Sequence, residues 1–232
     1  MKKQGKKYVE ASTKVEKNKA YELKEAIKLV QETSITKFDA TIEIAMNLKL
    51  DTKKADQQLR GSIVLPNGTG KTKRILVLAK GPAAEEAKKA GADFVGEQDL
   101  IDKIAKENWF EYDVIIATPE MMPVLGKIGK VLGPKGLMPN PKTGTVTPNP
   151  GKVVTDAKSG MVEYRADSYG NVHGIIGKVS FDEEAIAENL TYFVNAIVKA
   201  KPTAVKGKFV KNITITTTMG PGIKLSLNSF DI

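Results

Sequence analysis

The spacing of apolar residues in the first third of the chain predicts one helix followed by two strands. Within residues 20–32 apolar side chains recur every three or four positions, which is typical of an amphipathic helix. Residues 42–50 alternate strictly between apolar and other side chains, and this period of two predicts a half-buried strand. A short strand over 61–65 precedes the breaker at 66–70, and the Lys-rich residues 1–19 are expected to form an arm or a frayed start.

The middle of the chain changes to continuous apolar runs separated by helical segments. We expect strands over 74–79, 93–95 and 113–117, and helices over 82–89, 97–107 and 121–131. Strands that alternate with helices at this spacing predict a small parallel sheet with helices packed on it. Residues 132–151 are dense in Gly, Pro and Lys and are expected to form an irregular loop.

The last third predicts an antiparallel arrangement. We expect strands over 161–165 and 172–179, paired around a turn at Tyr169-Gly170-Asn171. A helix is expected from about residue 182, where Asp182 stands at the N-cap position, to residue 200. Two final strands, 210–218 and 223–227, are joined by Met219-Gly220-Pro221-Gly222.

These patterns predict a mixed fold of class α/β (α+β) with two domains. The first, residues 1–67 and 159–232, is a discontinuous two-layer domain of a sheet and helices; the second, residues 68–158, is an inserted Rossmann-like, three-layer α/β domain. Gly68, Gly70 and Gly160 are the expected hinge residues where the chain crosses between them, since glycine adopts the backbone angles that a hinge must pass through.

Composition favours a nucleic-acid partner and excludes several other classes. The 232 residues carry a formal net charge of +9, and a basic surface attracts polyanions because neutralised phosphates release their counterions. Residues 1–7 are basic, but no apolar run follows, so we expect neither a secretory signal nor a membrane span. The absence of cysteine excludes disulfides and thiolate metal sites, and it fits the cytosol.

Catalytic patterns are present only in fragments. Gly68-Thr69-Gly70-Lys71-Thr72 resembles the end of a phosphate-binding loop, but the motif needs a glycine at residue 65, where Leu65 stands, and a helix after it. Ser34-Ile35-Thr36-Lys37 and Lys142-Thr143-Gly144 match two elements of a serine-nucleophile set without the third. His173 is the single histidine; we interpret it as a structural or surface residue, or as an RNA contact. No catalytic residue, metal site or cofactor is predicted.

One long segment carries a specific motif. Gly126 to Lys142 contains the run Leu132-Gly133-Pro134-Lys135-Gly136-Leu137-Met138-Pro139-Asn140-Pro141-Lys142, whose lysines are suited to phosphates and whose glycines permit close backbone approach. This run resembles the signature of the ribosomal protein L-one family, the side-stalk proteins of the large subunit, in its bacterial form. Further segments agree with that family over essentially the whole chain: 37–39, 56–61, 90–93 and 216–221.

The resemblance implies a function and a binding surface. It implies binding to large-subunit (23S) rRNA at the mobile stalk, help in the release of deacylated tRNA from the exit site, and repression of the protein's own operon mRNA, in a cytoplasmic protein that is monomeric when free. The RNA surface that it implies lies on the first domain, at these residues: Lys37, Phe38, Thr217, Thr218, Met219 and Gly220, with Arg165, His173 and Lys178 as further candidates. Phe38 is either a core residue or a stacking platform.

Two alternatives remain at this point. A nucleotide-using enzyme with a Rossmann-like insert would need a Gly-rich turn, whereas Lys80-Gly81-Pro82 has a single glycine. A free-standing translational repressor would leave most of the protein unbound in ribosome fractions.

Overall fold

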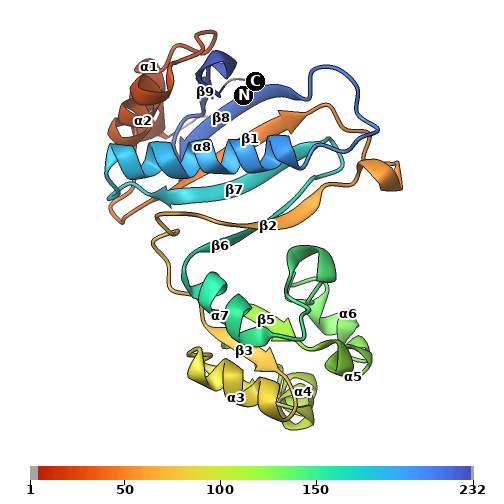
Figure 1. Ribbon diagram of the computed structural model, residues 1–232. Coiled ribbons are helices and arrows are strands. Elements are labelled where there is room, and N and C mark those ends of the chain that lie inside the picture. Colours follow the sequence, from red (N-terminus) through yellow and green to blue (C-terminus); the bar gives the residue numbers. More distant parts are fainter. Residues whose placement is uncertain (1–4, 231–232) are drawn as a thin grey trace. The chain divides into compact units, whose positions relative to one another are not determined.

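The computed structural model describes residues 5–230, which form two compact units (Figure 1). Unit 1 contains the chain up to Gly70 and from Val162 onward, and unit 2 contains Lys71–Met161. The sequence predicts domain boundaries at 67/68 and 158/159, three residues earlier at each crossing. That the units act as separate domains, with Gly68, Gly70 and Gly160 as hinges, stays a prediction.

Unit 1 is built on a four-stranded antiparallel sheet in the order β7-β1-β8-β9. Its strands are β1 (Thr41–Leu48), β7 (Asn171–Lys178), β8 (Val210–Thr217) and β9 (Ile223–Leu225). The alternation expected over residues 42–50 is confirmed in β1, where every second side chain from Ile42 to Leu48 is buried. This alternate burial follows from the helices that cover one face of the sheet, because successive side chains of a strand point to opposite faces.

Two helices cover one face of this sheet. Helix α2 (Leu23–Glu32) contacts β8 and β9, and α8 (Glu183–Lys199) contacts β7 and α2. Figure 1 shows α8 lying along the strands. Apolar side chains from both helices and the sheet form one core, with Phe193 of α8 fully buried in it. The opposite face of the sheet carries partly or fully exposed residues such as Ala45, His173 and Thr214.

The predicted pairing of residues 161–165 with 172–179 is wrong. β6 (Met161–Arg165) pairs instead with β2 (Arg60–Val64) in a separate two-stranded sheet, and β7 pairs with β1 from Thr41 to Asn47. Only the bridge between Ala166 and Val172 remains of the expected hairpin. The physical reason is that β1 gives β7 a partner along nearly its whole length, while Ile63 of β2 and Tyr164 of β6 add their side chains to the same core.

Unit 2 has a three-stranded parallel sheet in the order β4-β3-β5, as the alternation of strands and helices predicts. Leu76 and Leu78 belong to a core that they share with Ile101 and Ile104, whereas helices on the other side contact β3 and β5. The mixed α/β fold class is therefore confirmed. The elements are β3 (Ile75–Leu78), α3 (Pro82–Lys89), β4 (Phe94–Gly96), α4 (Gln98–Glu107), β5 (Val114–Ala117), α5 (Met122–Gly126), α6 (Gly129–Leu132) and α7 (Pro150–Lys158).

Three local predictions differ from the structure. Residues 1–4 of the expected arm lie outside the described residues, but the rest contains a helix, α1 (Lys6–Thr13), which buries Ala11. The helix expected over 121–131 is split into a 3-10 turn at Pro119–Met121, α5 and α6, because Gly126 and Gly129 weaken it. Helix α7 starts inside the expected loop, with Pro150 at its first position, which is a start signal that the sequence does contain. The remaining 3-10 turns are Ala55–Gln57, Pro141–Thr143 and Leu227–Phe230.

Candidate nucleic-acid interface

Most of the predicted RNA-binding residues meet at one end of the four-stranded sheet. At that end Thr41 of β1 lies opposite Lys178 of β7, and Ile42 lies opposite Thr217 of β8. The connection from α2 to β1 brings two further predicted residues to the same end. We call this group the strand-end cluster: Lys37, Phe38, Lys178, Thr217, Thr218, Met219 and Gly220.

The turn after β8 is fixed by hydrogen bonds. The Gly220 amide donates to the Thr217 carbonyl at 2.8 Å, and the Thr216 hydroxyl donates to the Gly220 carbonyl at 3.1 Å. The Thr41 amide donates to the Thr218 hydroxyl at 3.2 Å, which ties the turn to β1. Met219 has a positive φ of 68° and is 73% exposed. The turn therefore holds a large apolar side chain out into solvent, which is a strained arrangement that needs a local reason.

Thr217 is buried, and this corrects the expectation of a hydroxyl on the surface of the strand end. Its side chain is 1% exposed, because it continues the buried row of Ile213 and Ile215 on β8. Its Oγ1 has no hydrogen-bond partner. A Cβ at Gly220 would overlap this oxygen, so only a glycine fits above it. The hydroxyls of Ser12, Thr69, Tyr112 and Thr118 are also buried without a partner, so Thr217 is distinguished by the glycine that stands over its oxygen at the end of the sheet.

Phe38 and the two lysines complete the cluster. Phe38 is 62% exposed, so its alternative as a core residue is wrong and the stacking platform remains. Lys178 is half-buried and donates to the Thr41 hydroxyl at 2.9 Å and to the Asp39 carbonyl at 3.4 Å. Lys37 is exposed. The cluster thus combines an exposed ring, an exposed thioether and two cations.

Thr41 and Asp39 belong to this end as well, although neither is among the residues that the sequence predicts for the site. The Thr41 hydroxyl accepts a hydrogen bond from the Lys178 ammonium. The Asp39 carboxylate accepts two hydrogen bonds from Ser180, one from its backbone amide at 3.1 Å and one from its hydroxyl at 2.8 Å. The available signal was their place between Phe38 and the start of the alternating strand. Polar residues at the first position of a predicted strand are good candidates for such contacts.

Arg165 and His173 do not join the cluster. His173 lies opposite Ala45, in the middle of the β1–β7 ladder, with its Nε2 at 3.7 Å from Asp167 Oδ2. Arg165 is exposed at the end of β6, which belongs to the other sheet of unit 1. Their roles in RNA binding stay predictions for other parts of the surface.

The turn before β7 should make stability depend on pH at the acid end. Hydrogen bonds from Asn171, first from its side chain and then from its backbone, lower the pKa of Asp167 to about 2. Because the unfolded carboxyl has a pKa of about 3.9, this stabilisation is present above that pH and is lost as the pH falls toward 2. We expect Asp167→Asn to flatten the loss of stability between about pH 4 and pH 2, as measured by urea unfolding; an unchanged slope would contradict this.

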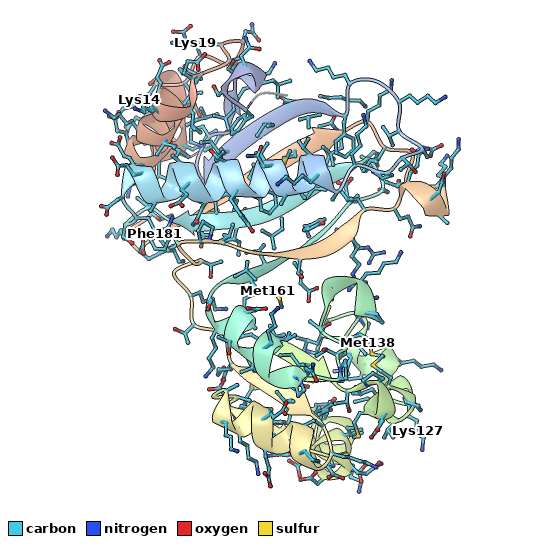
Figure 2. All side chains as sticks on the ribbon, viewed as in Figure 1. Lys14, Lys19, Lys127, Met138, Met161 and Phe181 are labelled. Atoms are coloured by element: carbon cyan, nitrogen blue, oxygen red, sulfur yellow. The ribbon has the colours of Figure 1, made fainter. Side chains whose placement is uncertain are left out.

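The signature segment of unit 2 is more ordered than a flexible loop. The Asn140 amide donates to Thr145 Oγ1 at 2.8 Å, and the Lys142 amide donates to Asn140 Oδ1 at 2.8 Å. Lys135 lies over the ring of Phe110 at 4.1 Å from its centroid. Pro139 is buried, while Gly133, Pro134, Gly136 and Pro141 are exposed. Figure 2 shows the neighbouring Lys127 and Met138 on the same part of unit 2. The segment is therefore a shaped surface with exposed lysines.

The hinge glycines differ in how firmly they are held. Gly68, Gly70 and Gly160 all have positive φ, of 65°, 71° and 111°. The Gly68 carbonyl accepts from Asn189 of α8 at 3.0 Å, so Gly68 is fastened to unit 1. A Cβ at Gly70 would lie 2.7 Å from Lys178 Cγ and 3.0 Å from the ring of Phe181, which is labelled in Figure 2. If the chain pivots here, the pivot falls after Gly68.

The part of the chain that the structure describes contains neither a metal-binding cluster nor a membrane-spanning helix. Among residues 5–230, no three His, Asp or Glu side chains are grouped so that they could hold a metal ion. Over the same residues, no helix has the length and apolar character needed to cross a membrane.

Comparisons with known proteins agree with the signature motif of the sequence. The model of the ribosomal protein L1p/L10e family matches residues 30–221. Two curated proteins from Streptococcus thermophilus, strains ATCC BAA-491 / LMD-9 and CNRZ 1066, both named large ribosomal subunit protein uL1, are each 56% identical over 229 residues. These alignments cover 99% of this chain and 100% of each relative. The resemblance seen in the sequence is confirmed, and the chain belongs to the ribosomal protein L1p/L10e family.

Proposed function

We propose that this protein is a constituent of the large ribosomal subunit that binds 23S rRNA through the strand-end cluster. Membership of a ribosomal protein family makes it a structural, non-enzymatic, cytoplasmic protein, and the enzyme alternative is dropped on that ground. The family match supports the ribosomal part of the proposal, and the geometry of the cluster supports the site.

The observation that carries the site is the unpartnered hydroxyl of Thr217 beneath Gly220. Leaving a buried hydroxyl without a partner costs about 1–3 kcal/mol. A ribose 2′-OH both donates and accepts, so it can pair with this oxygen once the turn at Gly220 moves aside, because Oγ1 is buried beneath that glycine. A ligand that forms a hydrogen bond with this hydroxyl would remove that cost, and the removed cost would add to the free energy of binding.

The neighbours of Thr217 supply the other parts of an RNA site. The exposed ring of Phe38 offers a face on which a base can stack, and Met219 offers a second apolar contact beside it. Lys37 and Lys178 would neutralise phosphates without reading sequence. The cluster is therefore suited to a folded RNA whose minor groove and unstacked bases meet the end of the sheet.

The finer functions rest on the family resemblance. We propose that the protein assists release of deacylated tRNA from the exit site, that it represses its own operon mRNA, and that it is monomeric when free. One cluster that binds both rRNA and mRNA would make the two RNAs compete, which is the simplest basis for repression. Movement of unit 2 about the crossings near Gly70 and Gly160 would assist the release of deacylated tRNA from the exit site.

Replacing Thr217 by valine tests the site. We expect Thr217→Val to weaken binding of a folded 23S rRNA stalk fragment by about 1 kcal/mol or more, because the hydrogen bond is lost. The same change should leave the free energy of unfolding unchanged or raise it, since valine removes an unsatisfied polar atom at similar volume. Fluorescence titration at low and moderate salt, with urea unfolding beside it, measures both.

Thr191→Val, on α8 away from the cluster, is the matched control and should leave RNA affinity unchanged. Wild-type binding that collapses with salt and ignores Thr217→Val would mean that the net charge of +9 accounts for all binding, and the site would be wrong. Sedimentation of ribosome fractions distinguishes a ribosomal protein from a free-standing translational repressor. A repressor would stay largely outside the ribosome fractions.

A further inference from the structure

A hollow of about 430 Å³ lies in unit 1 at the end of the sheet opposite the strand-end cluster. Its lining comes from the segment after β1 and from the loop that joins α8 to β8. Both segments lie at the right of unit 1 in Figure 1. We call it the lysine groove after the three cations in its lining: Lys49, Lys206 and Lys211.

The walls of the groove are held by hydrogen bonds. The Lys49 amide donates to the Phe209 carbonyl at 2.7 Å, which joins the two walls. The Asp51 amide donates to Gln57 Oε1 at 2.9 Å and closes the turn on one side. Lys201 Nζ donates to the Gly207 carbonyl at 2.9 Å and fastens the other loop. The lysines therefore stand on fixed backbone.

Positive charge is concentrated around this hollow. Residues 49–57 and 201–211 contain seven lysines and two aspartates, a balance of +5 within the net +9 of the whole chain. Within the described part of the chain, Lys49, Lys206 and Lys211 form no ion pair. The Asp51 carboxylate lies 4.0 Å from Lys54 Nζ. Three unpaired ammonium groups around one hollow repel one another unless an anion joins them.

We infer that the lysine groove binds backbone phosphates of the same RNA at a second place. This inference rests on the proposed function and adds to it a contact that the cluster does not include. Lysine ammoniums are point charges that position phosphate without reading bases. No exposed large apolar side chain belongs to the groove, which disfavours a membrane or an apolar peptide as its partner.

The distance between the strand-end cluster and the lysine groove gives a minimum length for the RNA that contacts both. β1 has eight residues and connects the end with the cluster to the end with the groove. At about 3.3 Å per residue, the two sites are roughly 25 Å apart along the sheet. The RNA must then present two separate stretches of backbone, one at each end of β1.

Neutralising the three lysines tests the inference in the full-length protein. We expect Lys49→Gln, Lys206→Gln and Lys211→Gln together to lower the affinity for the 23S rRNA stalk fragment roughly tenfold or more at moderate salt. The slope of log affinity against log salt should fall by roughly two, since each phosphate contact contributes about 0.7–0.9. Hydroxyl-radical footprinting should lose the stretch that the groove protects and keep the stretch that the strand-end cluster protects.

A second triple variant, Lys88→Gln, Lys89→Gln and Lys106→Gln, makes the same change in charge on unit 2 and should leave affinity and footprint unchanged. Equal losses in both triple variants would show a net-charge effect and overturn the inference. So would an unchanged salt slope in the groove variant, or lysine-dependent binding to anionic vesicles with RNA affinity unaltered. Failure of the wild type to bind the fragment at all would instead contradict the proposed function.

Discussion

Asn189→Leu should lower the free energy of unfolding by about 2–3 kcal/mol and loosen the first crossing between the units. Asn189 is fully buried on α8, and its amide nitrogen donates to the carbonyls of Gly68 and Ile176 at 3.0 and 2.8 Å. Its oxygen accepts from the Asn67 amide at 3.0 Å. Leucine keeps the volume but leaves three backbone groups without partners. The buried Ile176 carbonyl contributes most of the loss, since such a group costs about 1–3 kcal/mol, and the part-buried Asn67 amide and Gly68 carbonyl contribute less because water can reach them.

Urea unfolding measures the loss of stability, and limited trypsin digestion measures the loosening. Cleavage after Lys71 should become faster in Asn189→Leu, because the preceding segment is no longer tied to α8. Asn195→Leu, at an exposed position of the same helix, is the control and should change stability by less than about 0.5 kcal/mol. Equal behaviour of the two variants would show that Asn189 does not hold the crossing.

Phe193→Ala should lower the free energy of unfolding by about 3–5 kcal/mol. Phe193 is fully buried in the core of unit 1 and meets the ring of Tyr164 edge-on, with centroids 6.5 Å apart. A Cβ at Gly174 of β7 would lie 2.5 Å from its Cζ, so the ring fills the space that the glycine leaves. Truncation removes apolar contacts and creates a cavity that a close-packed core cannot fill by small movements.

A double-mutant cycle with Gly174→Ala tests the contact itself. Gly174→Ala alone should destabilise unit 1 by about 1–3 kcal/mol through overpacking, and by less in the Phe193→Ala background. Tyr192→Ala, at a neighbouring position that is 50% exposed, should cost under about 1 kcal/mol. Additive effects of Phe193→Ala and Gly174→Ala in thermal or urea unfolding would contradict the proposed packing.

The local pattern of apolar and polar residues was sufficient to predict a strand or helix that buries one face. The alternation in residues 42–50 predicts β1, and the apolar stripe of residues 182–200 predicts α8, because burial of one face leaves its period in the sequence. The same logic failed for β6 and β7. Adjacency along the chain predicts a hairpin there, but pairing depends on which distant strand offers the longer partner, and β1 does.

Some features of the candidate site could likewise be predicted from the sequence, and others depended on the tertiary structure. The motif at residues 216–221 and the pair Lys37 and Phe38 are visible in the sequence, and so is the family to which they belong. Pattern could not decide whether Phe38 is exposed, and it put the Thr217 hydroxyl on the surface. Exposure of a loop residue depends on its three-dimensional neighbours, and for Thr217 the register of β8 against β1 sets the buried side.

The sequence by itself determined that one part of the chain forms an antiparallel sheet and the other a parallel sheet, and it determined the basic charge and the signature segment. Each of these depends only on neighbouring residues or on composition. Only the tertiary structure decided that Asn189 fastens Gly68, that Gly220 stands over the Thr217 hydroxyl, and that Lys49 and Lys206 share one groove. These contacts join residues far apart in the chain. Their formation depends on how the helices and strands pack, which no local pattern of apolar and polar residues records.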